Sequence, residues 1–109
     1  MIPSSVRIFV CTEPQDMRRS FDGLARVTRE VLGEDPQAGA LFCFVNKRAN
    51  RLKILWWDQN GYCLLCKRLH RAIFVLPDVG VGPPVIDTKQ LARLLAGVAN
   101  DRRRQRQST

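Results

Sequence analysis

Cys63 and Cys66 have the Cys-x-x-Cys spacing of a metal-binding pair, so they are the first residues in this chain to consider for chemistry. We expect residues 62–69 to form a β-strand, on which side chains three positions apart point to opposite faces of the sheet. One cation could not contact both thiolates there, and the chain has no second pair of this kind. With Cys11 and Cys43 included, we expect four reduced, mostly buried thiols and no metal site.

Carboxylates and one histidine are the other candidate catalytic groups. Asp16, Asp22, Glu30 and Asp58 could form a two-metal nuclease site, but nothing in the sequence sets their mutual distances, and caps and ion pairs explain them more simply. His70 has no Ser or Cys partner for a triad, and no Gly-rich nucleotide-binding pattern occurs. We therefore predict a protein that is not an enzyme and has no cofactor, with a metal-dependent nuclease as the catalytic alternative.

The charge balance points to a polyanionic partner. The 109 residues include 18 Lys and Arg against 10 Asp and Glu, a formal net charge of +8 with a pI near 10.2. Four arginines and one aspartate among the last nine residues give +3, which leaves +5 on residues 1–100. Such an excess suits nucleic acid more often than an anionic membrane. The alternative is a basic protein without such a partner.

The length fits one domain, which we assign to residues 1–99, followed by a basic tail at 100–109 that we expect to be disordered. No apolar run approaches the ~20 residues of a membrane-spanning helix. The first residues also lack the pattern of a secretory signal. We expect a cytoplasmic protein without a membrane partner.

Hydrophobic periodicity predicts the elements that position these groups. Ser20 and Asp87 are the expected N-caps of two helices, and Gln90 completes a capping-box pattern with Asp87. The predicted strands are 6–11, 41–45, 51–58, 62–69 and 73–76, and the predicted helices are 20–33 and 88–98. This order indicates an α+β fold, an antiparallel meander of four to five strands with both helices packed on one face.

The strongest local signal is a hairpin around Asn60-Gly61, a dipeptide typical of two-residue type I′ turns. Such a turn pairs Gln59 with Tyr62. One face of the hairpin then carries the opposed pairs Trp57–Leu64, Leu55–Cys66, Lys53–Arg68 and Arg51–His70. The adjacent Trp56 and Trp57 must point to opposite faces, where we expect packing rather than base stacking.

Several cations lie at one end of that face. There the like charges of Lys53 and Arg68, directly opposite each other, destabilise the sheet unless an anion lies nearby. A set of like charges on a rigid ribbon is typical of phosphate binding. The predicted nucleic-acid contacts are Lys47, Arg48, Arg51, Lys53, Lys67, Arg68 and Arg71, and the predicted electrostatic arm in the tail is Arg102, Arg103, Arg104 and Arg106. The alternative is that these cations only keep the sheet soluble and block edge pairing. A register slip of one residue would exchange the faces and remove the argument.

Three segments resemble the successive signatures of one family: DMRRSFDGLA at 16–25, RLKILWWD at 51–58 and LARLLAG at 91–97. Between the last two, Gly61, Leu64, Lys67-Arg68-Leu69, Phe74 and Pro77 also fit. Over about residues 3–98 the chain resembles the small TnpB accessory protein, the second reading frame of the sixty-six-type bacterial insertion sequences.

The resemblance implies a non-catalytic role in DNA transposition beside a separate, larger DDE-type transposase. The implied partners are DNA (element ends or non-specific duplex), the transposase and the other element-encoded protein. A subunit that contacts the transposase without binding DNA is the alternative. His70 and Ala72 depart from the family, which commonly has an acid and a glycine there, and the Arg-rich tail replaces a short acidic-aromatic ending.

Overall fold

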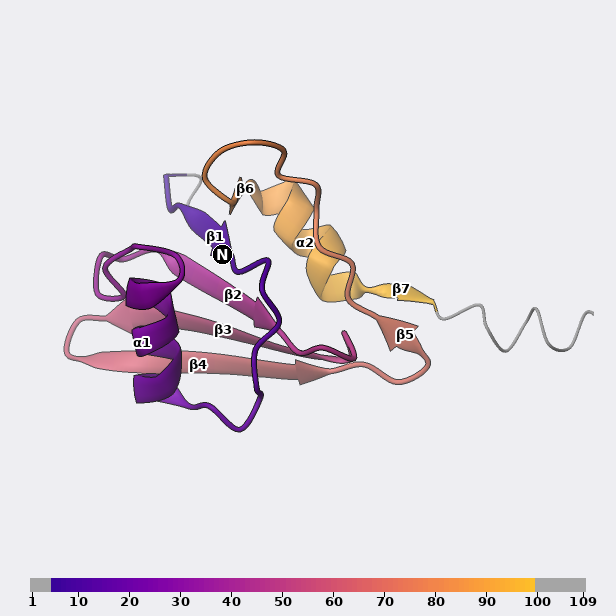
Figure 1. Cartoon of the computed structure of the whole chain (residues 1–109), viewed down its shortest axis with the longest axis horizontal. Helices are drawn as coiled ribbons and strands as arrows, with labels where there is room; N and C mark the ends of the chain where they lie inside the picture. Colours follow the sequence, from indigo (N-terminus) through magenta and orange to yellow (C-terminus); the bar gives the residue numbers. More distant parts are fainter. Residues whose placement is uncertain (1–4, 100–109) are drawn as a thin grey trace, which may run out of the picture.

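The computed structural model describes residues 5–99, and within them the expected α+β class is confirmed (Figure 1). Two helices accompany a five-stranded, mostly antiparallel sheet and a small second sheet. In chain order the elements are β1 (Ile8–Val10), α1 (Phe21–Glu30), β2 (Leu41–Val45), β3 (Arg51–Asp58), β4 (Gly61–Arg68), β5 (Ala72–Ile73), β6 (Val85–Ile86), α2 (Thr88–Ala96) and β7 (Val98–Ala99).

The main sheet has the strand order β4-β3-β2-β1-β6. β2, β3 and β4 form the expected antiparallel meander, whereas β1 lies parallel to β2. Parallel neighbours need a crossover connection, and α1 lies in that connection. β6 pairs antiparallel with β1, and β5 pairs with β7 in the second sheet. β6 and β7 have no counterpart among the predicted elements, and the expected strand at 73–76 is reduced to β5.

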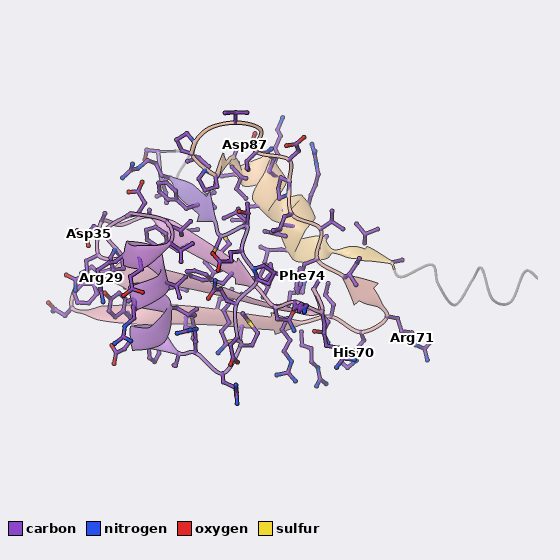
Figure 2. All side chains as sticks on the ribbon, viewed as in Figure 1. Arg29, Asp35, His70, Arg71, Phe74 and Asp87 are labelled. Atoms are coloured by element: carbon purple, nitrogen blue, oxygen red, sulfur yellow. The ribbon has the colours of Figure 1, made fainter. Side chains whose placement is uncertain are left out.

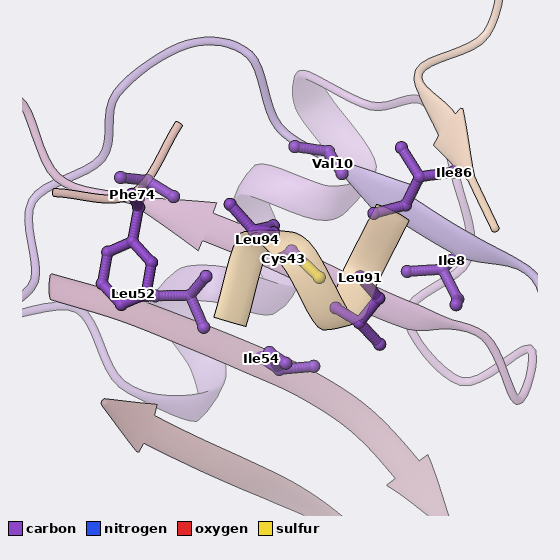
Figure 3. Close-up of a cluster of buried hydrophobic side chains, with 10 residues drawn as sticks. Ile8, Val10, Cys43, Leu52, Ile54, Phe74, Ile86, Leu91 and Leu94 are labelled. Atoms are coloured by element: carbon purple, nitrogen blue, oxygen red, sulfur yellow. The ribbon is translucent and has the colours of Figure 1, made fainter. Parts of the chain in front are cut away.

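The two helices cover opposite faces of the main sheet, which corrects the expectation that both pack on one face. Leu24 of α1 is buried with Phe9, Phe42, Phe44 and Leu55, on what we call the α1 face. On the other, the α2 face, side chains of α2 pack against those of the sheet, as Figure 3 shows for Leu91, Leu94, Ile8, Val10, Cys43, Leu52 and Ile54. The reason is β2, which is apolar throughout and buried on both faces, so each face needs its own cover.

The helix ends agree in part with the sequence. The predicted capping box of α2 is confirmed: the Gln90 N–H donates to Asp87 Oδ1 over 2.7 Å, and the Asp87 N–H donates to Gln90 Oε1 over 2.9 Å. Ser20 precedes α1 as expected, but its side chain makes no capping hydrogen bond.

The β3–β4 hairpin turns one residue earlier than predicted. Asp58 pairs with Gly61, so the turn residues are Gln59 and Asn60, and of these two only Gln59 has a positive φ, +52°. That pattern fits a type II′ turn rather than type I′. The change places Trp57 opposite Tyr62, where the rings meet edge to face with centroids 5.0 Å apart. The expected register lacks this aromatic contact, worth about 0.5–1.5 kcal/mol.

Candidate nucleic-acid interface

The cationic end of the β3–β4 ribbon survives the change of register. Because the pairing shifts by two residues and side chains alternate with a period of two, Arg51, Lys53 and Arg68 still share the α1 face. Arg51 now lies opposite Arg68, and Lys53 lies opposite Cys66. The exposed Arg51 and Arg68 and the half-buried Lys53 line a cavity of about 350 Å³ together with Met17.

The loop before α1 is fastened to this surface. Lys53 Nζ donates a hydrogen bond to the Arg19 carbonyl oxygen over 2.8 Å. The Arg19 side chain packs so closely on the first turn of α1 that a Cβ at Gly23 would stand 3.2 Å from Arg19 Cβ. Met17 and Arg19 therefore lie beside these cations, with Arg18 between them in the sequence, and the sequence analysis included none of the three. The Arg18-Arg19 pair directly before a predicted helix was the signal that could have indicated them.

A closed turn carries the next two cations. Asn46 Oδ1 accepts hydrogen bonds from the N–H groups of Asn50 and Arg51 over 3.1 and 2.9 Å, and Asn46 Nδ2 donates to Asn50 Oδ1 over 2.7 Å. The exposed Lys47 and Arg48 project from this turn. Its internal bonds hold the backbone that carries the two cations in place before any ligand arrives.

The chain after β4 folds back onto the same turn. The Leu69 N–H donates to the Asn50 carbonyl over 2.8 Å, and the Phe74 N–H donates to the Ala49 carbonyl over 2.7 Å. The exposed Arg71 thereby joins Lys47 and Arg48 around a polar cavity of about 500 Å³. Figure 2 shows His70 and Arg71 at this end of the ribbon, away from Arg29 and Asp35. We call the resulting set the ribbon-end surface: Lys47, Arg48, Arg51, Lys53, Arg68 and Arg71.

Lys67, also a predicted contact, lies elsewhere. It pairs with Leu52 and therefore faces the α2 side of the sheet, where its Nζ donates to the Leu95 carbonyl at the end of α2 over 2.6 Å. The position suits a cation, because the last carbonyls of a helix carry partial negative charge. Lys67 therefore differs from its neighbour Arg68 in the face that it occupies and in its bond to α2, although it also lines the 350 Å³ cavity.

Ion pairing does not neutralise the ribbon-end surface. Among residues 5–99 the one ion pair joins Arg18 Nη2 to Asp16 Oδ2 over 2.7 Å. The hydrogen bonds from Arg18 hold the pKa of Asp16 at about 2, below its usual range, so this carboxylate stays charged. The Arg68 side chain lies beside His70, whose Nε2 is 3.5 Å from Arg68 Nη2. The six cations thus face solvent or backbone rather than any acid among residues 5–99.

The alternative chemistries find no assembled site in residues 5–99, where no group of three or more His, Cys, Asp or Glu side chains could hold a metal ion. Cys63 and Cys66 lie on opposite faces of β4, as the alternation predicts. Cys11 and Cys43 are buried, and burial raises the pKa of the Cys43 thiol to about 12. Asp58, from the imagined nuclease set, ends β3 at the turn, at the opposite end of the strand from Arg51.

The predictions for the tail and for the membrane remain. The tail arginines Arg102, Arg103, Arg104 and Arg106, and the tail at 100–109 as a whole, fall outside the described residues. Within residues 5–99, neither helix has the length and apolar character needed to cross a membrane.

Comparison with known proteins supplies the context for this surface. The family described as IS66 Orf2 like protein, TnpB of IS66, matches residues 6–105. Two uncharacterized proteins of Sinorhizobium fredii are similar: y4hO is 41% identical over 100 residues, covering 90% of this chain and 87% of its own, and y4jC is 36% identical over 93 residues, covering 85% and 80%. No solved structure matches. The family match spans nearly the whole chain, and the protein therefore belongs to the IS66 Orf2-like family, as its three sequence signatures indicated.

Proposed function

We propose that this transposition accessory protein acts without catalysis and binds duplex DNA through its ribbon-end surface. The observation that carries the proposal is the convergence of six cations from β3, β4 and the two turns that flank the hairpin, with no carboxylate in salt-bridge distance among residues 5–99. Arg51 directly opposite Arg68 is unfavourable in an isolated sheet. A phosphate backbone supplies the missing negative charge.

The side chains favour the phosphate backbone of a duplex over single-stranded bases. Binding of single strands relies on exposed aromatic rings that stack on successive bases. The two cavities of the ribbon-end surface have no aromatic lining residue in the described chain. Trp57 and Tyr62 share the α1 face but sit at the turn end of the hairpin, where they pack on each other. Binding should therefore depend strongly on salt and only weakly on sequence.

A charge-reversal pair tests the proposal. Arg51→Glu with Arg68→Glu should weaken binding to a labelled duplex by more than tenfold, because two repulsive charges replace two attractive ones. The matched control is Arg26→Glu with Arg29→Glu, which makes the same charge change on exposed positions of α1. Fluorescence anisotropy against element ends and a scrambled duplex, at two salt concentrations, measures both. Equal affinities of the two double variants would refute this surface.

Contact with the transposase remains the second candidate function, because apolar side chains lie exposed at the end of α2. Val75 and Val98 are 52% and 53% exposed and line a cavity of about 310 Å³ with Leu76, Leu94 and Arg93. Exposed apolar patches mark protein contacts more often than they mark nucleic-acid sites. Salt-resistant capture of the transposase by wild type, lost in Val75→Lys with Val98→Lys, would establish this role, and capture unchanged by those substitutions would place the contact elsewhere.

A further inference from the structure

The outer edge of β4 is a long strand edge to which no other strand of residues 5–99 is bonded. β4 is the last strand of the main sheet, and within this part of the chain it pairs with β3 alone. Its eight residues pair in one continuous register, without a proline or a bulge to interrupt the edge. Native proteins usually protect such an edge, because its free N–H and C=O groups can pair with another chain.

The hydrogen-bond pattern identifies the backbone groups that point outward. The Leu69 N–H donates to the Asn50 carbonyl, and these two residues are the next pair in the β3–β4 register. Because successive residues of an antiparallel strand alternate between the two edges, the odd-numbered residues of β4 bond to β3. Among residues 5–99, no hydrogen bond reaches the N–H and C=O groups on the outer edge. These groups belong to the even-numbered residues Tyr62, Leu64, Cys66 and Arg68.

Donors and acceptors therefore occur together along this edge, at the spacing of a β-strand. An extended peptide matches them with its own N–H and C=O groups, as in the addition of a strand to an exposed sheet edge. A nucleic-acid backbone offers phosphate oxygens, which only accept hydrogen bonds, so it would leave the outward carbonyls unpaired. The edge fits a protein segment rather than the duplex proposed for the ribbon-end surface.

The side chains beside the edge define the chemistry of that segment. Lys67 and Arg68 are exposed at one end of β4. Nearer its middle, Leu65 is 39% exposed on the α2 face. On the α1 face, α1 begins beside β4 (Figure 1), and its first residue, Phe21, is 43% exposed. A complementary segment has acidic residues at the cationic end and apolar residues beside Leu65.

A second copy of this chain does not offer such a segment through the same edge. β4 contains no acidic residue, so pairing of two β4 strands would leave Lys67 and Arg68 without a counter-charge. Cationic side chains on an edge also oppose pairing with a neutral strand. The two cations therefore select an acidic partner rather than closing the edge to every partner.

We infer that the outer edge of β4 is a docking site for an extended segment of a partner protein, with acidic residues beside Lys67 and Arg68 and apolar residues beside Leu65. The segment adds a further strand to the main sheet. Backbone hydrogen bonds supply its affinity, and the side chains supply its specificity. This site takes a protein ligand, so it does not depend on the proposed binding of DNA.

The test uses the full chain without DNA and a labelled synthetic peptide of alternating valine and glutamate, about ten residues long. Fluorescence anisotropy compares this peptide with two N-methylated forms of the same charge. Methylation of every second residue leaves one peptide edge free and should retain binding. Methylation of every residue blocks both edges and should weaken binding at least about tenfold. Equal affinities of all three peptides would show attraction by charge alone and overturn the inference, as would no binding of the unmethylated peptide.

A matched pair of protein variants tests the edge itself. Cys66→Pro removes one outward N–H, and proline is tolerated where the N–H of an edge strand faces solvent. Cys66→Ala truncates the same exposed side chain and keeps the N–H. The affinity for the unmethylated peptide should fall about fivefold in Cys66→Pro and stay unchanged in Cys66→Ala. Equal affinities of the two folded variants would contradict docking at this edge.

Hydrogen exchange of the wild-type protein, measured by NMR, gives a test that needs no variant. The outward N–H groups of Leu64 and Cys66 should exchange at least about fivefold more slowly once the peptide is bound. The N–H of Leu65, which bonds to β3, should change less. Unchanged exchange at Leu64 and Cys66 in the peptide complex would place the peptide elsewhere and refute the inference.

Discussion

Arg68 and Lys67 form a matched pair for testing the interface, because they are neighbours on β4 with the same charge and opposite faces. Arg68 belongs to the ribbon-end surface, whereas Lys67 bonds to the Leu95 carbonyl on the α2 side. If all six cations of the surface engage phosphates, they contribute about −5.4 to the slope of log affinity against log salt concentration. Arg68→Gln should reduce that contribution to about −4.5, and Lys67→Gln should leave it unchanged.

The same arithmetic gives the expected size of the effect. One phosphate contact changes affinity about 3.5-fold between 50 and 200 mM salt, so the deficit of Arg68→Gln relative to wild type should shrink by about that factor over this range. Tail contributions cancel in the comparison because both variants keep the tail. Fluorescence anisotropy at several salt concentrations measures the slopes.

The control measurement is the free energy of unfolding from urea titrations. Lys67→Gln removes the hydrogen bond to the end of α2 and should lower the free energy of unfolding by about 1 kcal/mol. Arg68→Gln should lower it less, because within residues 5–99 the Arg68 side chain lies beside His70 and bonds to no carboxylate or carbonyl. Equal salt slopes for the two variants, or a larger change for Lys67→Gln, would refute the proposal that DNA binds on the α1 face of β4.

Three further predictions follow from single residues. Asp16→Asn should tighten duplex binding a few-fold at low salt in the anisotropy assay, because it releases Arg18 from its ion pair, whereas a nuclease role for Asp16 predicts lost Mg²⁺-dependent cleavage. Gln59→Gly should raise the unfolding free energy by about 0.5–1 kcal/mol in urea titrations, by relieving the positive φ of the turn, without changing DNA affinity. Burial raises the pKa of Cys43 to about 12, so the folded protein keeps this thiol protonated at pH values where the unfolded chain loses the proton. The free energy of unfolding is therefore unaffected below the thiol's usual pKa and falls as the pH rises from there toward 12. Urea titrations from pH 8 to 10.5 should therefore show a decline in the free energy of unfolding that is smaller in Cys43→Ala by up to about 1.4 kcal/mol per pH unit, the buried Cys11 supplying part of the remainder.

Local patterns gave the elements whose cause lies within a few residues. The capping box of Asp87 and Gln90 needs only adjacent backbone, and the strand bounds at Leu41–Val45 and Arg51–Asp58 follow from composition and turn residues. The side on which each helix packs was not accessible in this way. The side on which a helix packs depends on the face of the sheet over which its connecting segments pass. The unbroken apolar run of β2 already indicated that both faces of this strand are covered. β6 and β7 are two residues long, and each forms a strand only by pairing with a strand distant in the sequence, β1 and β5 respectively.

The face on which Arg51, Lys53 and Arg68 lie could be predicted from the sequence despite a wrong turn, and the reason is parity. Moving the turn from Asn60-Gly61 to Gln59-Asn60 shifts every pair by two residues, and an even shift changes neighbours but not faces. Arg51 and Arg68 were therefore placed on the correct side with the wrong partners, and Lys67 on the other side. What the hairpin pattern could not supply is the β5–β7 pairing, since Ala72 and Ala99 are 27 positions apart in the sequence. The faces of one hairpin follow from local sequence, whereas contacts between distant segments follow only from the assembled fold.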